Sequence, residues 1–298
     1  MGKIIYFDWN IKEKPSDFLV KEVSELEKDE NEQFYLYLLI KKNMNTKDIT
    51  DRFKLSYAGL KDKNAITFQY VTSQQFLGNT IFEKNQDSFF ALIYQEKVRK
   101  KLKIGQLKGN KFSIKLKGHR LKLKDWFINY YDLQRIIRNR ERGKKLLKEL
   151  KSGIKWKHLK WRENFYIDAY LSHLWNKAVM YALKQKYDGF LVVEKGVKYF
   201  IPYTDHNELM SDFYKFFPIL GYKVKLSSEE ENIYREITQK EIPFDELMEK
   251  LSQLRIKGDY RKTFLKAEDV YIKGDRINFF LPKGAYATMF LKNQEIIR

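Results

Sequence analysis

Residues 57–69 read YAGLKDKNAITFQ, a stretch that joins a polar turn to a segment with strand periodicity. Within it, Asp62 stands between Lys61 and Lys63, shortly after a glycine. From Ile66 onward, alternate residues fall on opposite sides with a period of two, which predicts a strand with at least one apolar face. We therefore expect Asp62 to lie in a loop anchored to a sheet, where its side chain is both exposed and fixed.

The rest of the chain is arranged in blocks of strand-like and helix-like segments. The expected strands are residues 3–7, 17–22, 33–42, 88–95, 111–117, 119–124, 268–272 and 275–281. The expected helices are residues 46–53, 126–150, 163–186 and 227–256. Strands, then helices, then strands again indicate an α+β protein in which the two strand-rich ends form one domain around a helical insertion.

The composition excludes several kinds of site and protein. The 298 residues include no cysteine, which rules out disulfides, thiolate catalysis and cysteine-ligated zinc. The four histidines, His119, His158, His173 and His206, show no ligand spacing, so we expect no metal site. No apolar run has the length of a signal peptide or of the roughly 20 residues that a membrane span needs. We therefore expect a soluble, cytoplasmic protein.

The formal net charge of +19 is concentrated in one part of the chain. Residues 97–160 contain 23 lysines and arginines but only 4 aspartates and glutamates, and the remaining residues are balanced. Aromatic residues are interleaved with these cations: Phe112, Trp126, Phe127, Tyr130, Tyr131, Trp156 and Trp161. Cationic side chains bind phosphates and aromatic faces stack on unpaired bases. This combination favours an RNA or single-stranded partner, with a solvated lysine-rich face as the alternative.

Eight motifs follow one another along nearly the whole chain. They are PSDFLVKE (15–22), KNMNT (42–46), AGLKDKNAITFQ (58–69), KLKIGQLKGNKFSI (101–114), INYYDLQR (128–135), SHLWN (172–176), GDYRKTFLKAEDV (258–270) and FFLPKGAYATMFL (279–291). Together, and in this order, they resemble the TruD family of tRNA pseudouridine synthases. The chain departs from the family pattern at Asp132, Ile136 and Ile137, which replace a glycine, a phenylalanine and a glycine.

The resemblance implies a fold and a domain division. The implied fold is α+β, with a mixed, largely antiparallel-sheet pseudouridine synthase catalytic domain and an inserted, mainly helical TRUD domain. The catalytic domain would be discontinuous, formed by residues 1–138 and 257–298. The inserted TRUD domain would span residues 139–256.

The resemblance also implies which residues act. Asp62 matches the catalytic aspartate of the family, and its cationic neighbours favour an ionised carboxylate, which can attack as a nucleophile or stabilise a cationic sugar centre. Asn110 and Phe112 match positions that contact the target uridine at its edge and its face. Phe18 and Tyr286 match two further aromatic positions at the pocket. The alternatives are a turn residue for Asp62 and ordinary core packing for the three aromatic residues.

These matches predict an isomerase that converts a uridine of tRNA, most commonly uridine 13 in this family, into pseudouridine. The family chemistry needs no cofactor and no metal. We expect a monomer whose partner is tRNA or another structured RNA, with no membrane association. The alternatives are pseudouridylation of another structured RNA and a non-catalytic RNA-binding or RNA-folding protein on the same scaffold. A nuclease is a third, and it is disfavoured because Asp62 has no partner carboxylate or histidine cluster in the sequence.

Overall fold

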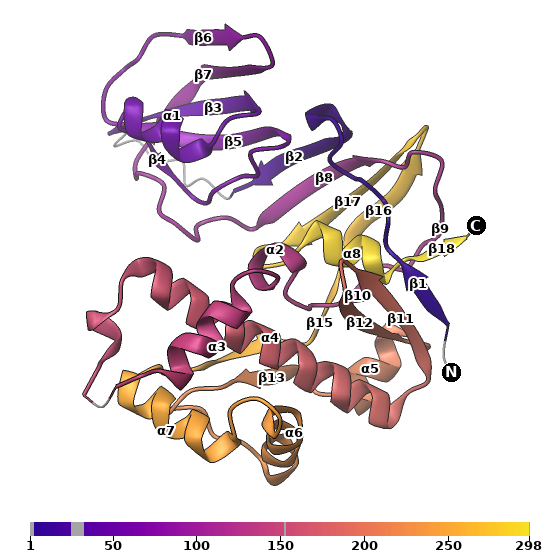
Figure 1. Ribbon diagram of the computed structural model, residues 1–298. Coiled ribbons are helices and arrows are strands. Elements are labelled where there is room, and N and C mark those ends of the chain that lie inside the picture. Colours follow the sequence, from indigo (N-terminus) through magenta and orange to yellow (C-terminus); the bar gives the residue numbers. More distant parts are fainter. Residues whose placement is uncertain (1–2, 25–32, 152, 298) are drawn as a thin grey trace. The chain divides into compact units, whose positions relative to one another are not determined.

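The computed structural model describes residues 3–24, 33–151 and 153–297, and the chain divides into two compact units (Figure 1). Unit 1 consists of Met1–Asp8, Trp126–Lys266 and Thr288–Asn293, and unit 2 consists of Trp9–Asp125, Ala267–Ala287 and Gln294–Arg298. The predicted insertion, 139–256, falls wholly within unit 1. Unit 1 also takes in residues 1–8, 126–138, 257–266 and 288–293, which the domain division expected from the sequence places in the catalytic domain.

Unit 2 is built on a nine-stranded sheet of order β16-β17-β8-β2-β5-β3-β7-β6, with β4 paired to β5. The strands are β2 (Phe18–Val23), β3 (Phe34–Lys42), β4 (Ser56–Tyr57), β5 (Ile66–Ser73), β6 (Thr80–Asn85), β7 (Ser88–Val98), β8 (Gly109–Lys115), β16 (Glu268–Lys273) and β17 (Arg276–Pro282). Within this sheet β2 and β5 run parallel and the other neighbours run antiparallel. The predicted mixed, largely antiparallel sheet is thereby confirmed, and both ends of the chain contribute strands to it.

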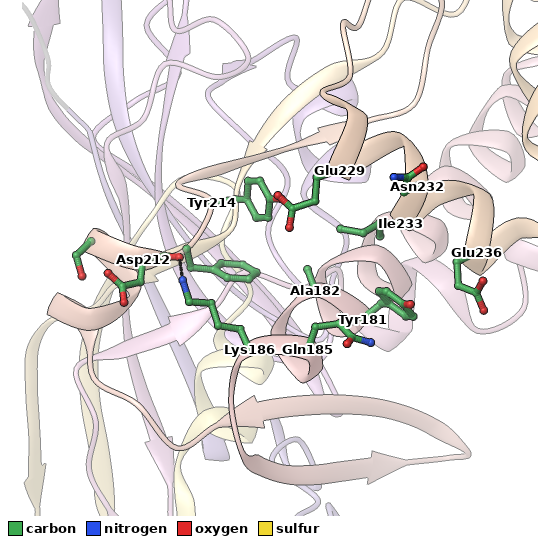
Figure 2. A pocket seen from close by; sticks show the side chains of 12 residues that line it. Tyr181, Ala182, Gln185, Lys186, Asp212, Tyr214, Glu229, Asn232, Ile233 and Glu236 are labelled. Atoms are coloured by element: carbon green, nitrogen blue, oxygen red, sulfur yellow. Dashed lines mark hydrogen bonds between the residues drawn. The ribbon is translucent and has the colours of Figure 1, made fainter.

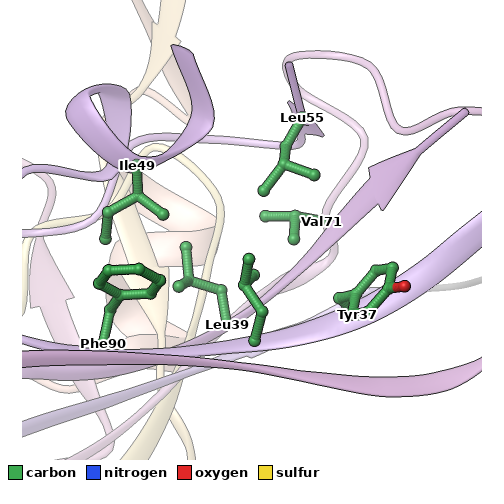
Figure 3. Packing of buried hydrophobic residues seen from close by; sticks show 7 residues of the cluster. Tyr37, Leu39, Ile49, Leu55, Val71 and Phe90 are labelled. Carbon is green, nitrogen blue, oxygen red and sulfur yellow. The ribbon is translucent and has the colours of Figure 1, made fainter. Parts of the chain in front are cut away.

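The remaining elements of unit 2 are short. They are η1 (Pro15–Asp17), α1 (Thr46–Arg52), β9 (Arg120–Lys122) and β18 (Glu295–Ile297). Helix α1 covers part of one sheet face, where its Ile49 packs into a buried hydrophobic cluster (Figure 3). The other buried members of this cluster are Tyr37, Leu39, Leu55, Val71, Phe90 and Leu92.

The two sides of β5 differ in burial in an unexpected way. Thr67 and Gln69 point to the same side as Val71 and are fully buried. Phe68 and Tyr70, on the more apolar side, are only half-buried. The covered face of the sheet therefore receives polar side chains from this strand, while rings lie on the open face.

Unit 1 is mainly helical and is organised around the 26-residue helix α4 (Trp161–Lys186). Its other helices are α2 (Leu133–Ile136), α3 (Arg140–Lys148), η2 (Trp156–His158), α5 (His206–Asp212), α6 (Ser228–Thr238) and α7 (Phe244–Leu254), and α8 (Ala287–Asn293) enters it after Ala287. Its strands are β1 (Ile4–Tyr6), β10 (Trp126–Ile128), β11 (Gly189–Glu194), β12 (Val197–Pro202), β13 (Phe216–Ile219), β14 (Asp259–Lys262) and β15 (Phe264–Lys266). Helices α3 and α4 pack closely at Gly143, where an added Cβ would lie 2.0 Å from the carbonyl oxygen of Tyr166.

The single helix predicted over residues 126–150 is wrong. Its first residues form β10, which pairs antiparallel with β15. The side-chain amide of Asn129 then donates to the carbonyl of Lys262 at 3.0 Å, and Arg261 donates to the side-chain oxygen of Asn129 at 2.8 Å. These bonds fix the segment before α2, so the helical pattern belongs to α2 and α3 alone. The hairpin of β11 and β12 and the strand β13 were not predicted.

Across the three described ranges, no helix is both long enough and apolar enough to cross a membrane.

Candidate active site

Asp62 lies in the loop between β4 and β5, as the sequence predicted. Its Oδ1 accepts a hydrogen bond from the backbone N–H of Asn64 at 3.0 Å, a local turn that aspartate favours. Its Oδ2 is ion-paired with the ammonium group of Lys12. The side chain keeps 27% of its surface exposed. The carboxylate is therefore oriented from two sides and still accessible.

Buried polar residues of the neighbouring strands hold the backbone of this loop. The ammonium group of Lys41, on β3, donates a hydrogen bond to the backbone carbonyl oxygen of Asp62 at 2.8 Å. Gln69, on β5, donates to the carbonyl of Gly59 at 3.2 Å and accepts from the hydroxyl of Thr46 at 2.9 Å. The polar side of β5 is buried because it supports this loop.

The lysines around Asp62 have different partners. Lys61, which the sequence suggested as electrostatic support for Asp62, is paired with Glu22 of β2, and both of these side chains are buried. Lys41 is fully buried, and burial lowers its pKa to about 8, although the nearby Asp62 opposes the shift. Lys12 is the cation that contacts the carboxylate.

Phe18 and Phe112 form an aromatic wall beside Lys12. Their rings meet edge to face with centroids 5.9 Å apart, and the Phe112 ring stacks on Phe279 of β17 at 5.3 Å. The ammonium of Lys12 lies 4.5 Å from the centroid of the Phe18 ring, which links the wall to Asp62. Phe18 is buried and Phe112 is half-buried, so the accessible part of the wall belongs to Phe112.

Asn110 lies on the same sheet face as Phe112 and pairs across the strands with Glu22. Its side-chain oxygen is buried and has no hydrogen-bond partner among the described residues. Leaving a buried acceptor unpaired costs about 1–3 kcal/mol. Such an atom is therefore a candidate to receive a donor from a bound molecule.

Tyr286 lies in the turn after β17, the strand next to β8, and is half-buried. This turn is tied to the entrance of β8, because the N–H of Lys283 donates to the carbonyl of Lys108 at 3.1 Å. At the start of β8, a Cβ on Gly109 would lie 2.2 Å from the carbonyl oxygen of Leu281, so glycine permits the close approach of the two strands. The structure thus gathers Asp62, Phe18, Asn110 and Phe112 around β2, and it places Tyr286 one strand further along.

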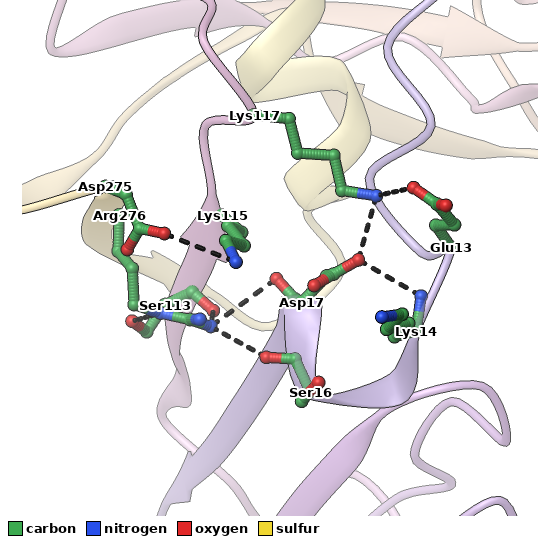
Figure 4. A network of polar contacts seen from close by, with 9 residues as sticks. All are labelled: Glu13, Lys14, Ser16, Asp17, Ser113, Lys115, Lys117, Asp275 and Arg276. Carbon is green, nitrogen blue, oxygen red and sulfur yellow. Dashed lines mark hydrogen bonds and ion pairs between the residues drawn. The ribbon is translucent and has the colours of Figure 1, made fainter.

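A polar network fixes residues 13–17, the segment that leads into β2 (Figure 4). Lys117 pairs with Glu13 at 2.6 Å and with Asp17 at 2.8 Å. Arg276, on β17, donates to the carbonyl of Asp17 at 3.4 Å. Burial of Asp17 raises its pKa, but the hydrogen bonds from Lys117 and from the backbone outweigh this and bring the pKa below its usual value. The network therefore holds the carboxylate of Asp17 ionised and the segment in place.

Elsewhere, the described ranges hold a large cavity but no metal-binding cluster. No three histidine, aspartate or glutamate side chains there come close enough together to hold a metal ion. A cavity of about 800 Å³ lies within unit 1, between α4, α6 and the end of α5, and its lining includes Tyr181, Tyr214, Glu229 and Glu236 (Figure 2). None of the predicted site residues lines this cavity.

The family model of tRNA pseudouridine synthase D (TruD) matches residues 7–150 and 157–294. The chain belongs to the TruD family. Members of this family are isomerases, and the match includes the motifs and all five predicted site residues. The family resemblance and the α+β fold expected from the sequence are thereby confirmed.

Relatives from archaea and bacteria match along nearly their whole length. The Nanoarchaeum equitans protein named "Probable tRNA pseudouridine synthase D" is 26% identical over 379 residues, covering 95% of this chain and 97% of that protein. The tRNA pseudouridine synthase D of Haemophilus influenzae (strain PittEE) is 26% identical over 319 residues, covering 95% and 92%. The crystal structure of the "Putative tRNA pseudouridine synthase D (TruD)" from Methanosarcina mazei shares the fold with a TM-score of 0.62 at 16% identity, covering 95% of this chain and 92% of that one.

Sequence reasoning did not select three charged residues that contact the Asp62 loop. Lys12 lies just before the first motif, and Glu22 ends it. Lys41 follows Tyr37 and Leu39 at inward positions of β3. The sequence did contain a signal for Glu22 and Lys41. Each is a charged residue at a position where the alternation of a buried strand directs the side chain inward.

Proposed function

We propose that this TruD-family chain converts a uridine of tRNA into pseudouridine, with uridine 13 as the target and Asp62 as the nucleophile. The observation that carries the proposal is the oriented, accessible carboxylate of Asp62, paired with Lys12 beside the aromatic wall of Phe18 and Phe112. The relatives described above are named tRNA pseudouridine synthase D, which supports tRNA as the substrate. The monomeric state and cytoplasmic location stay predictions.

The reaction breaks the N1–C1′ bond of uridine and forms a C5–C1′ bond in its place. The carboxylate of Asp62 attacks the sugar carbon, or stabilises its positive charge, as uracil leaves with the electron pair of the broken bond. Uracil turns and C5 bonds to C1′; where Asp62 has bonded to C1′, that bond breaks in this step and its electron pair returns to the carboxylate. The C5 proton then passes to solvent while N1 takes one up. Substrate and product have the same atoms, so the step needs no co-reactant. Lys12 holds the carboxylate in a fixed orientation throughout.

Base recognition is assigned to residues on the same sheet face. The unpaired oxygen of Asn110 accepts a hydrogen bond from the N3–H of uracil, which removes the cost of leaving this buried acceptor unpaired. The accessible part of the Phe112 ring packs on the base. Tyr286 is proposed as a further aromatic contact from the turn after β17.

Replacing Asp62 by asparagine tests the nucleophile. Asparagine keeps the shape and the turn but removes the charge, so we expect RNA affinity to be retained and single-turnover conversion to fall by at least about a thousandfold. The measurement uses saturating enzyme, so that altered affinity cannot imitate lost chemistry. Carbodiimide mapping of the product then identifies the modified position.

Asp87→Asn is the matched control, because Asp87 is an exposed turn aspartate in the β6–β7 hairpin of the same unit. We expect this variant to convert RNA at the wild-type rate. Wild-type conversion by Asp62→Asn would remove Asp62 from the chemistry. A wild-type chain that binds tRNA without converting it would instead favour the non-catalytic alternative, and a signal at another position or in another RNA would replace uridine 13 as the target.

A further inference from the structure

The nine-stranded sheet of unit 2 has a second face, opposite the side chains of Asn110 and Phe112. A groove of about 650 Å³ lies there, a size typical of ligand sites. It runs over strands from both ends of the chain, and its lining includes Lys21, Phe68, Tyr70, Lys111 and Tyr271, which project to this face. Phe112, whose neighbour Lys111 projects to this face, also contributes to the lining. Half-exposed rings on an open sheet face are unusual unless something covers them.

Two cations stand side by side in this groove. Lys21 of β2 and Lys111 of β8 are directly paired across the two strands, so their side chains project to the same face. Like charges at directly opposite positions destabilise a sheet. Lys111 has an exposed partner, Asp269, at 3.3 Å, and no acidic side chain of the described ranges pairs with Lys21. A bound anion would remove this repulsion.

Aromatic rings flank the lysine pair. Phe68 of β5 pairs in register with Lys21, and Tyr70 follows it on the same face. On the other side of the groove Tyr271 of β16 keeps 51% of its surface exposed. Proteins bind unpaired nucleotides on sheet surfaces with cationic side chains, which contact the phosphates, and with aromatic rings, which stack on the bases. This groove presents both.

We propose that this groove binds an unpaired segment of RNA, with Lys21 and Lys111 on a phosphate and with Tyr271 and Phe68 stacking on bases. A second copy of this chain is a poorer occupant, because two chains of net charge +19 repel each other and the paired lysines would face a surface of the same charge. The site lies on the opposite sheet face from Asn110, so it would hold RNA that is not being modified. The inference rests on the proposed function only in taking RNA as the ligand.

Binding of a short, fluorescently labelled oligouridylate tests the groove. We expect Tyr271→Ser, at an exposed position, to weaken binding at least about fivefold because one base no longer stacks. We expect the double variant Lys21→Gln, Lys111→Gln to lower the slope of log K against log salt by about 0.7 for each phosphate that is no longer neutralised. Photo-cross-linking with 4-thiouridine should label β5 or β16.

The matched control, Lys47→Gln with Lys84→Gln, removes the same charge from exposed positions elsewhere in unit 2. Binding that responds equally to the control pair and to the groove pair, or that ignores Tyr271→Ser in a variant with wild-type thermal stability, would overturn the proposal. So would a wild-type dimer that Tyr271→Ser dissociates while oligouridylate binding stays unchanged. The proposed function fails separately, through normal conversion by Asp62→Asn, and that outcome leaves oligouridylate binding unaffected.

Discussion

Lys41 places an ammonium group on the covered face of the sheet, next to the backbone carbonyl of Asp62. Its hydrogen bond to that carbonyl, at 2.8 Å, offsets only part of the cost of burying a cation. Burial lowers the pKa to about 8 from an ordinary 10.5. Between these pH values the unfolded chain binds a proton that the folded chain has released, so the contribution of Lys41 to stability increases as pH rises through this window.

Replacing Lys41 by methionine should reveal this dependence. We expect the unfolding free energy of the wild type, relative to Lys41→Met, to rise by roughly 3 kcal/mol between about pH 7.5 and pH 11. Denaturant titrations at several pH values measure the difference, and exposed Lys84→Met serves as the control with a flat profile. If the difference in unfolding free energy between the wild type and Lys41→Met does not change with pH, the buried amine keeps an ordinary pKa. We also expect slower single-turnover conversion, because the loop carbonyl loses its donor.

Asp62 could be selected from the sequence because the residues that identify it are its neighbours in the chain. Its ion-pair partner could not, because Lys12 is 50 residues away in the sequence. The adjacent Lys61 was the natural candidate, but its side chain is directed to Glu22 on the neighbouring strand. A turn fixes which residues are close in sequence, whereas the direction of each side chain depends on strands that pair from elsewhere.

Strand β5 shows the same limit at the level of an element. Its period of two predicts the strand, and the β5 strand runs from Ile66 to Ser73. The pattern does not say which side is covered, and the buried side carries Thr67 and Gln69 because α1 and the Asp62 loop pack there. For residues 126–150 the helical pattern begins before the helices do, because antiparallel pairing with β15 at the start of this segment overrides local preference.

The segment leading into β2 depends on Lys117, and this element can be tested by substitution. Lys117→Gln removes two close ion pairs and leaves the buried carboxylate of Asp17 with its backbone donor. We expect a decrease in unfolding free energy near neutral pH, because the carboxylate of Asp17 loses a charged hydrogen-bond donor. This decrease should shrink in acid, since the lowered pKa of Asp17 stabilises the fold above the usual aspartate pKa, and that stabilisation disappears as pH falls through the folded-state value.

Lys115→Gln is the control from the same network. The Lys115–Asp275 pair is 3.4 Å long and largely exposed, so its removal should cost under about 1 kcal/mol. Equal decreases for the two variants would show that Lys117 acts only as a surface charge. A larger decrease for Lys117→Gln, accompanied by slower conversion, would support a role for the network in holding Lys12 and Phe18.

At the scale of the whole molecule, the basic segment that the sequence singled out is divided between the units. Residues 97–125 belong to unit 2, which carries Asp62, and residues 126–160 belong to unit 1. Several of its cations are engaged within the protein, as Lys144 is by Glu141 at 2.8 Å. The charge available to RNA is therefore smaller than the sequence count, and it comes from both units.

The salt dependence of tRNA affinity can assign this charge. Lys101 and Lys103 are exposed in unit 2, and Lys148 and Lys157 are exposed in unit 1. If both units contact the phosphate backbone, replacing either pair with glutamine lowers the slope of log K against log salt by up to about 1.4, which is 0.7 for each phosphate. Filter binding across roughly 50–300 mM salt measures the slopes.

Lys198 and Lys240, exposed in unit 1 but outside the basic segment, supply the control pair. Their replacement should leave the slope unchanged, because they lie in the charge-balanced part of the chain. The effects of the two test pairs should add, since cations in separate units neutralise different phosphates. A slope that responds to the unit 2 pair alone would confine the RNA to the unit that carries Asp62, and unit 1 would then contribute no electrostatic affinity.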